Sequence, residues 1–203
     1  MRTLILAARI LSSVFRPTYY PLVGFFILFT FTYMSVVPWQ YKACVLGVVY
    51  LFTVFMPALR IYCYRRIHGL SALQLRIRHR RAWPYIISLV CYFCCLRLMQ
   101  VMRLPMFMGA IIASSLLIHC VCLVVNMRWK ISMHSAGAGG IIGSLMAYAS
   151  IFGFNPVWWL CGAILLDGLV MTSRMLLRQH TLGQVLGGSA VGIVCGYFGI
   201  ILT

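Results

Sequence analysis

The chain of 203 residues is 63% hydrophobic, has a mean hydropathy of +0.98, and carries a formal net charge of +16 with a single acidic residue, Asp167. Soluble domains are about half apolar, so this composition excludes a soluble globular protein and predicts one integral membrane domain. The apolar runs are long and continuous, without the alternation of a barrel strand, which favours an all-α fold. The basic residues lie in short loops between these runs, which argues against nucleic acid as a partner and predicts contact with anionic membrane lipids.

The first 18 residues predict an amphipathic helix that lies in the membrane interface. Arg2, Arg9 and Arg16 are spaced through an otherwise apolar stretch, MRTLILAARILSSVFRP, and this pattern is typical of a basic interfacial helix. A retained N-terminal anchor explains residues 1–18 more simply than a removed signal peptide does.

Seven apolar segments follow, each close to the roughly 20 residues that a membrane-spanning helix needs. They cover residues 21–38, 43–62, 84–101, 105–127, 135–153, 157–172 and 182–202. The connecting loops are short, which predicts antiparallel neighbours, except for the basic loop 63–83. We therefore expect one all-α domain over residues 1–203, a polytopic bundle of six to seven transmembrane helices whose functional core is residues 128–203.

The basic residues are distributed unequally between the two ends of this predicted bundle. With seven spans, the N-terminus and the loops 60–83, 128–134 and 173–181 share one side of the membrane. All but three of the 17 basic residues then lie on that side, the three being Lys42, Arg97 and Arg103. The positive-inside rule makes this side cytoplasmic, unless some of the arginines are ligands and do not report topology.

Three polar segments interrupt the apolar sequence on that side. They are RIRHRRAWP at 76–84, RWKISMHSAGAGG at 128–140 and SRMLLRQHTLGQ at 173–184. Guanidinium groups match the oxygens of phosphate in pairs, and a histidine can act as nucleophile or general acid near neutral pH. The small residues at 135–140 allow either close approach of a ligand to the helix N-terminus or tight helix packing. The three segments together predict a phosphate-binding site.

The last two segments resemble the type 2 phosphatidic acid phosphatase superfamily, whose three signatures are K-x6-R-P, P-S-G-H and S-R-x5-H-x3-D. Ser173, Arg174 and His180 match the third signature, and Gln184 stands in place of its final Asp. Ser132 and His134 match the second signature. Arg76 followed by Trp83 and Pro84 matches the first signature poorly. The similarity covers most of the chain and is to a compact bacterial branch, which implies an integral membrane phosphatase of the bacterial cytoplasmic membrane.

The resemblance implies a role for each site residue. His180 attacks phosphorus and forms a phosphohistidine, and His134 protonates the leaving oxygen. The phosphate-binding residues are Arg174, Lys130, Ser132, Arg76, Arg78 and Arg81. The substrate is a lipid phosphate or diphosphate, and neither a metal nor another cofactor is needed.

Two departures leave an alternative open. Gln184 can accept a hydrogen bond from His180 but cannot stabilise a positive imidazole by charge. This favours a catalytically impaired relative that binds or moves anionic phospholipids, whereas the pair of histidines favours an enzyme. Superfamily sites usually face away from the cytoplasm, opposite to the charge count. A small transporter fits less well because no interrupted helices or paired repeats are evident.

Asp167 lies within a predicted span, where a carboxyl group is a functional candidate. Because it precedes Arg174 by seven residues, both lie on roughly the same helix face. It either pairs with a basic residue of the site, substitutes for the missing Asp beside His180, or packs as a neutral carboxyl at a helix interface.

Overall fold

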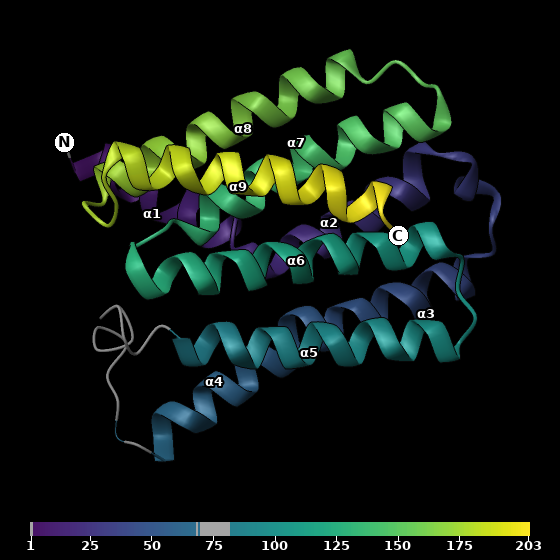
Figure 1. Cartoon of the computed structure of the whole chain (residues 1–203), viewed down its shortest axis with the longest axis horizontal. Coiled ribbons are helices and arrows are strands. Elements are labelled where there is room, and N and C mark those ends of the chain that lie inside the picture. The colour runs from purple at the N-terminus through teal and green to yellow at the C-terminus, as the bar shows by residue number, and fades with distance from the viewer. Residues whose placement is uncertain (1, 68, 70–81) are drawn as a thin grey trace.

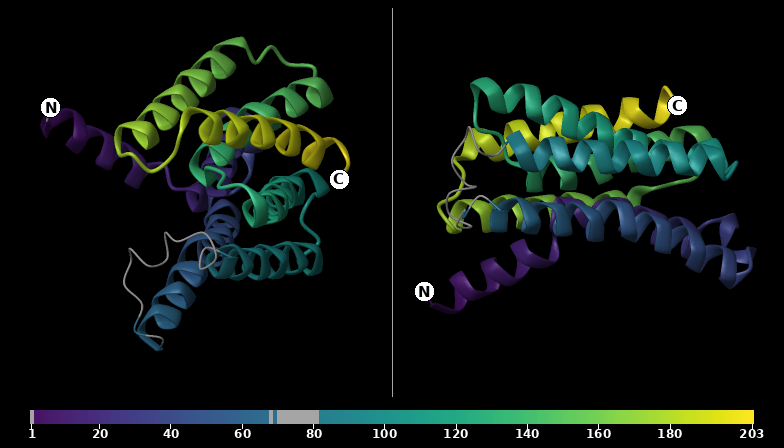
Figure 2. Two further views of the ribbon diagram at one scale, coloured as in Figure 1. Left: turned by 60° about the vertical axis from the view of Figure 1, so that its left-hand side comes forward. Right: turned by 90° about the horizontal axis from the view of Figure 1, so that it is seen from below.

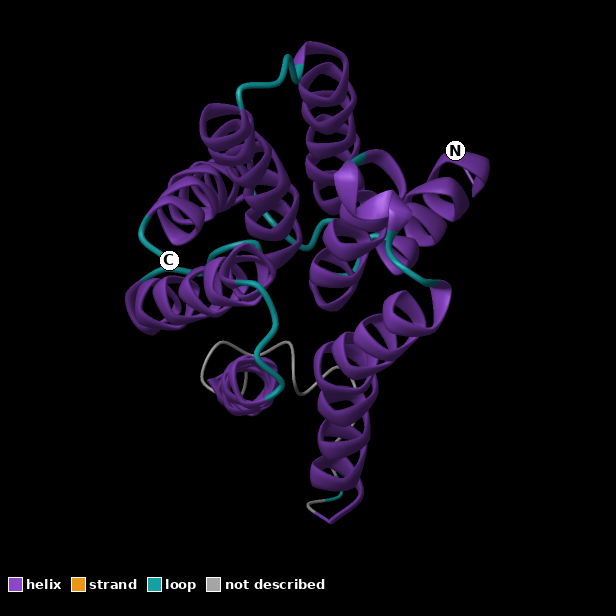
Figure 3. Cartoon of the chain, turned by 90° about the vertical axis from the view of Figure 1, so that its right-hand side faces the viewer, coloured by secondary structure: helices purple, strands orange, loops and turns teal. Residues whose placement is uncertain are grey.

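The computed structural model describes residues 2–67, 69 and 82–203, and in this part of the chain the regular elements are all helices (Figures 1 and 3). The α-helices are α1 (Arg2–Val14), α2 (Tyr20–Phe31), α3 (Trp39–Tyr50), α4 (Met56–Ile67), α5 (Ala82–Val101), α6 (Met106–Arg128), α7 (Met133–Phe152), α8 (Val157–Leu176) and α9 (Leu182–Ile201). Two 3-10 helices, η1 (Pro17–Tyr19) and η2 (Tyr33–Val36), flank α2, and a π-helical turn, η3 (Leu51–Phe55), joins α3 to α4. The predicted all-α fold is confirmed.

Within the described residues, six helical stretches are long and apolar enough to cross a membrane. They are Trp39–Ile67, Trp83–Val101, Met106–Arg128, Met133–Phe152, Val157–Leu176 and Leu182–Ile201. The first of them runs without a break through α3, the π turn and α4. The protein is therefore a multi-pass membrane protein, and these stretches correspond to six of the seven predicted spans.

The prediction of one continuous span over residues 21–38 is wrong. The helix α2 ends at Phe31, and Thr32 has an extended backbone with φ −114° and ψ −179°. The Thr32 hydroxyl accepts a hydrogen bond from the Met34 N–H at 3.2 Å and so caps η2, in competition with continuation of the helix. The 12 residues of α2 extend only about 18 Å, although α2 and η2 still lead the chain from the end that holds α1 to the opposite end (Figure 1).

The helices α7 and α9 pack with their backbones in contact. A Cβ atom built on Gly143 would lie 2.0 Å from the Ile193 carbonyl oxygen, and one on Gly139 would lie 2.3 Å from that of Ser189. Small residues permit this approach in membrane bundles, where dispersion and not hydrophobicity holds helices together. From the sequence, the small residues at 135–140 are expected to permit either close approach of a ligand or tight helix packing. The Gly139 contact confirms tight helix packing.

This packing predicts opposite effects for two glycine-to-alanine substitutions. The Cβ of Gly192→Ala would lie 2.0 Å from the Ala136 carbonyl oxygen, whereas nothing lies within 4 Å of a Cβ at Gly162 on α8. We expect Gly192→Ala to destabilise the protein by about 3 kcal/mol, the upper end of the usual cost of overpacking, because two backbones must separate. Gly162→Ala should be neutral or stabilising by up to about 1 kcal/mol. Thermal unfolding in detergent compares the two; equal midpoints would contradict the close α7–α9 contact.

The helix α1 departs from the direction of the bundle and packs against α8 (Figure 2). Its buried side chains are Ala8 and Ser12, one helical turn apart. Large apolar side chains on its other faces, including Leu4, Leu6 and Ile10, stay exposed. The small-residue face of α1 therefore packs on the protein and its large apolar side chains point away from the bundle; that α1 lies in the membrane interface stays a prediction.

Candidate functional site

The loops before α7 and before α9 lie side by side at the end of the bundle that also holds α1 (Figure 1). The Lys130 ammonium donates a hydrogen bond to the Gln179 carbonyl oxygen at 2.8 Å. The backbone N–H of Ser132 donates to the Gln184 carbonyl oxygen at 3.2 Å. Two of the three polar segments are therefore in direct contact. The predicted phosphate ligands of the remaining segment, Arg76, Arg78 and Arg81, lie outside the described residues.

His180 is held by the first turn of α9. The Gln184 Oε1 atom lies 3.1 Å from His180 Nδ1 and accepts a hydrogen bond from the Thr181 backbone N–H at 3.3 Å. Because a backbone N–H only donates, it identifies this side-chain atom as the amide oxygen, which only accepts. His180 Nδ1 must then carry the proton, which places the lone pair of the ring on Nε2.

His134 is the second residue of α7 and its ring meets the third polar segment. The ring interacts electrostatically with Arg174 and His180, and also with Arg16, which follows α1. The backbone of Ser12 also lies near this ring. The two histidines and the arginine that sequence reasoning selected are thus brought together from three helix ends.

Ser132 holds α7 in place from within the protein. Its side chain is fully buried, and its Oγ accepts hydrogen bonds from the backbone N–H of Ser135 at 3.4 Å and from the Ser135 hydroxyl at 3.1 Å. This is an N-cap, which satisfies one of the donors that a helix start leaves unpaired. The structure thereby places the predicted phosphate ligand Ser132 behind His134, as the residue that fixes where α7 begins.

Arg174 lies in the last turn of α8 and is 8% exposed. Its Nη1 donates a 2.5 Å hydrogen bond to the hydroxyl of Ser12 on α1. The guanidinium is thus covered by the N-terminal helix, which brings Ser12 and Arg16 into the site. Sequence reasoning missed both residues as site components; the signal was a pair of small residues one turn apart, Ala8 and Ser12, in an otherwise bulky apolar helix.

Tyr20 at the start of α2 is a further site residue that sequence reasoning missed. Its hydroxyl donates hydrogen bonds to the carbonyl oxygens of His134 at 3.3 Å and Phe15 at 3.4 Å. Its ring lies against α7 so closely that a Cβ on Gly137 would be 2.2 Å away. Tyr20 therefore ties the start of α2 to the backbone beside the His134 ring.

Asp167 is 3% exposed and accepts a hydrogen bond from the Ser189 hydroxyl on α9. It lies about 10 Å before Arg174 along α8. The ring partner of His180 is Gln184. Among the three predicted roles, the structure places Asp167 at a helix interface, where it joins α8 to α9 beneath the site.

The Ser12–Arg174 contact predicts a loss of stability in Ser12→Ala. The substitution removes one hydrogen-bond acceptor of a buried charged side chain, which costs about 1–3 kcal/mol and should lower the unfolding midpoint by about 2–10 °C. Ser13→Ala is the matched control because Ser13 is exposed and its hydroxyl accepts a long hydrogen bond, of 3.4 Å, from Arg16. Equal midpoints for the two variants in a thermal scan would show that α1 is not anchored through Arg174.

Among residues 2–67, 69 and 82–203, no three histidine, cysteine or acidic side chains cluster so as to hold a metal ion. The groups that the site offers to a ligand are cationic and imidazole side chains. No protein-family model, curated protein or solved structure matches the chain.

Proposed function

We propose that the protein is a membrane phosphatase of the type 2 phosphatidic acid phosphatase superfamily, acting on a lipid phosphate or diphosphate in a bacterial cytoplasmic membrane. One observation carries the proposal: the His134 ring is within electrostatic reach of His180 and Arg174, and Gln184 Oε1 lies 3.1 Å from His180 Nδ1. A binding pocket for an anion needs only cations. Two imidazoles, one with its tautomer fixed, are what nucleophilic catalysis with a general acid requires.

We propose the following reaction. The Nε2 lone pair of His180 attacks phosphorus and the bond from phosphorus to the lipid oxygen breaks. His134, which takes up a proton once the negative phosphate is bound beside it, gives that proton to the lipid oxygen. Water then attacks the phosphohistidine, His134 takes a proton from the water, and inorganic phosphate leaves. Arg174 and Lys130 hold the phosphate oxygens. Arg76, Arg78 and Arg81, in the basic segment 63–83, are proposed as further cations.

For Arg174 to hold phosphate, its guanidinium must share or exchange the Ser12 hydroxyl that it now binds. The hydroxyl is a neutral acceptor, whereas phosphate offers charged oxygens to the same fork of donors, and charge-assisted hydrogen bonds are roughly twice as strong. An incoming phosphate can therefore displace Ser12. Substrate binding and the docking of α1 are coupled in this proposal.

A second candidate function rests on Gln184. An amide orients the His180 ring but supplies no negative charge for the imidazolium that forms during the reaction. If this loss stops turnover, the cationic site still binds anionic phospholipids, and the protein acts as a binding or lipid-moving relative of the enzymes.

The experiment that separates the two functions measures phosphate release and lipid binding on the same detergent-purified protein. The substrates are phosphatidic acid, phosphatidylglycerophosphate, a polyprenyl diphosphate and a lipid A phosphate. Release from at least one of them by the native chain supports the enzyme and names the headgroup. Binding to anionic lipids without release from any of them supports the second function.

A further inference from the structure

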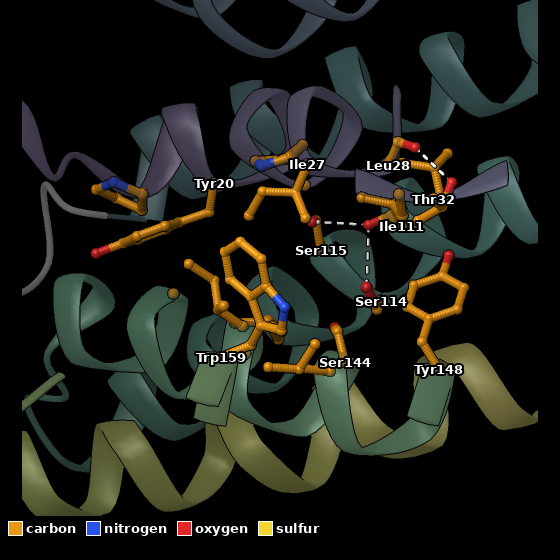
Figure 4. Close-up of a pocket in the computed structure, with 18 of the residues that line it drawn as sticks. Tyr20, Ile27, Leu28, Thr32, Ile111, Ser114, Ser115, Ser144, Tyr148 and Trp159 are labelled. Carbon is orange, nitrogen blue, oxygen red and sulfur yellow. Dashed lines mark hydrogen bonds between the residues drawn. The ribbon is translucent and has the colours of Figure 1, made fainter. Parts of the chain in front are cut away.

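A cavity of about 410 Å³ lies beside the site, between α2, α6, α7 and the start of α8 (Figure 4). One face of α7 lines it from end to end, through Met133, Gly137, Gly140, Ile141, Ser144, Leu145, Tyr148 and Phe152. These residues recur at three- and four-residue spacing, which keeps them on one side of the helix. The distance from Met133 to Phe152 along α7 is about 28 Å, so the cavity is long and narrow.

The hydroxyl groups in the walls of this cavity offer a phosphate or another anion no hydrogen-bond donor that is not already in use. The lining hydroxyl groups all donate to carbonyl oxygens of the protein: Tyr20 to His134 (3.3 Å), Thr32 to Leu28 (2.5 Å), Ser114 and Ser115 to Ile111 (3.0 and 2.9 Å), Ser144 to Gly196 (3.5 Å), and Tyr148 to Phe107. The lining histidine, His119, has its Nδ1 2.8 Å from the Ser115 carbonyl oxygen. A polar ligand would lose its hydration here without replacement, whereas a hydrocarbon would not.

The cavity is connected to the candidate site through Tyr20, which lines the cavity and contacts the backbone of His134. Tyr20 and Met133 line its first part, and the Tyr20 hydroxyl binds the His134 carbonyl oxygen. If the phosphate of a lipid lies between His134 and His180, the first carbon atoms of its hydrocarbon chain would therefore lie next to the start of the cavity. Thr32 and Tyr148 line the other end, seen on the right of Figure 4.

We propose that this cavity holds a single hydrocarbon chain of the lipid phosphate, and that the chain is longer than one leaflet of the membrane. The volume is near the lower end of the roughly 300–1,000 Å³ found for small-ligand pockets, which suits one chain and not two. The length approaches the full hydrocarbon thickness of about 30 Å, about twice what one leaflet chain covers. A polyprenyl phosphate has such a chain. The proposal rests on the proposed function only for the position of the headgroup.

Blocking the cavity midway tests the proposal. Ser144 lies about 16 Å along α7 from Met133, so Ser144→Phe should shorten the cavity without reaching the site. Ser150→Phe is the matched control, since Ser150 is an exposed residue of the same helix and does not line the cavity. The probes are a long-chain polyprenyl phosphate and geranyl phosphate, whose chain is too short to reach Ser144. Binding to the full-length protein in detergent is measured for both.

We expect Ser144→Phe to weaken binding of the polyprenyl phosphate by at least about tenfold, because two methylenes removed from an apolar cavity suffice for that change. Binding of geranyl phosphate should be unchanged, and Ser150→Phe should alter neither. If Ser144→Phe fails to fold, Ser115→Phe on the α6 wall replaces it. Unchanged polyprenyl phosphate binding in the folded blocking variant would overturn the proposal.

Because binding is measured apart from phosphate release, the two proposals fail separately. One outcome is that Ser144→Phe weakens binding of the long-chain lipid and not of the short-chain lipid, while no lipid phosphate releases phosphate. This outcome would overturn the phosphatase proposal and support the proposal that the cavity binds the lipid chain. Phosphate release by native protein, with a chain-length dependence that the blocking variant leaves intact, would support the phosphatase and overturn the cavity.

Discussion

His180→Ala should abolish phosphate release, with a loss of at least about 10³-fold in kcat, because the substitution removes the proposed nucleophile. The alanine has no atom that can bond to phosphorus, and the role proposed for His134, on α7, is protonation of the leaving oxygen. Release of inorganic phosphate from the best lipid substrate, measured in detergent at saturating substrate, gives kcat for native protein and variant. Phospholipid binding should persist because Arg174 and Lys130 remain.

The control for this substitution is Gln179→Ala in the same loop. Gln179 contributes its backbone carbonyl to Lys130, which alanine retains, so phosphate release should stay close to the native rate. In His180→Ala the Gln184 oxygen keeps its Thr181 N–H donor, so α9 should still begin at the same place. Release by His180→Ala at the rate of Gln179→Ala would exclude His180 as the nucleophile.

Gln184→Glu should increase phosphate release by about 10- to 100-fold. Glutamate has the length of glutamine, so an oxygen can still accept from Thr181 N–H and His180 Nδ1–H, now with a negative charge. Charge-assisted hydrogen bonds are roughly twice as strong as neutral ones. Each additional 1.4 kcal/mol or so by which the carboxylate stabilises the transition state increases the rate about tenfold. The gain is smaller than the 10⁴-fold loss known for carboxylate-to-amide changes, where the tautomer is also wrong.

The opposite change separates the charge of this residue from its orienting role. Gln184→Leu keeps the approximate volume but removes the oxygen, so the His180 ring loses its tautomer and α9 loses a cap. We expect release below the native rate. If kcat of Gln184→Glu does not exceed that of native protein in the same assay, while both variants stay folded, imidazolium stabilisation does not limit the reaction.

The parts of the fold that could be predicted from the sequence depend on local composition. Long apolar runs mark helices such as α6 and α9 because the membrane demands them. The break at Thr32 was not predicted, because threonine is apolar enough to continue a hydropathy pattern and only its hydroxyl, turned toward Met34 N–H, ends the helix. Hydropathy measures the free energy of transferring a side chain out of water. It does not show where a side-chain oxygen accepts a hydrogen bond from a backbone N–H and so ends a helix.

The candidate site was predictable where its residues lie close in sequence. His180 lies two residues before α9 and Gln184 is the third residue of that helix, so the four-residue spacing of the motif already places the two side chains near each other. Ser12 is 162 residues from Arg174, and no local rule connects them. Asp167 and Ser189 are likewise joined only by the packing of α8 on α9, which explains why the partner of this single acidic residue could not be identified from the sequence.

The central claim is a covalent phosphohistidine, and the most direct measurement is to trap it. Native protein is mixed briefly with a ³²P-labelled lipid phosphate, quenched in alkali, digested, and analysed for labelled peptides, with His134→Ala and His180→Ala alongside. We predict an acid-labile, base-stable label on the peptide that contains His180, retained in His134→Ala and absent from His180→Ala. Phosphate release by native protein with no label on this peptide, or with the label retained in His180→Ala, would contradict the account.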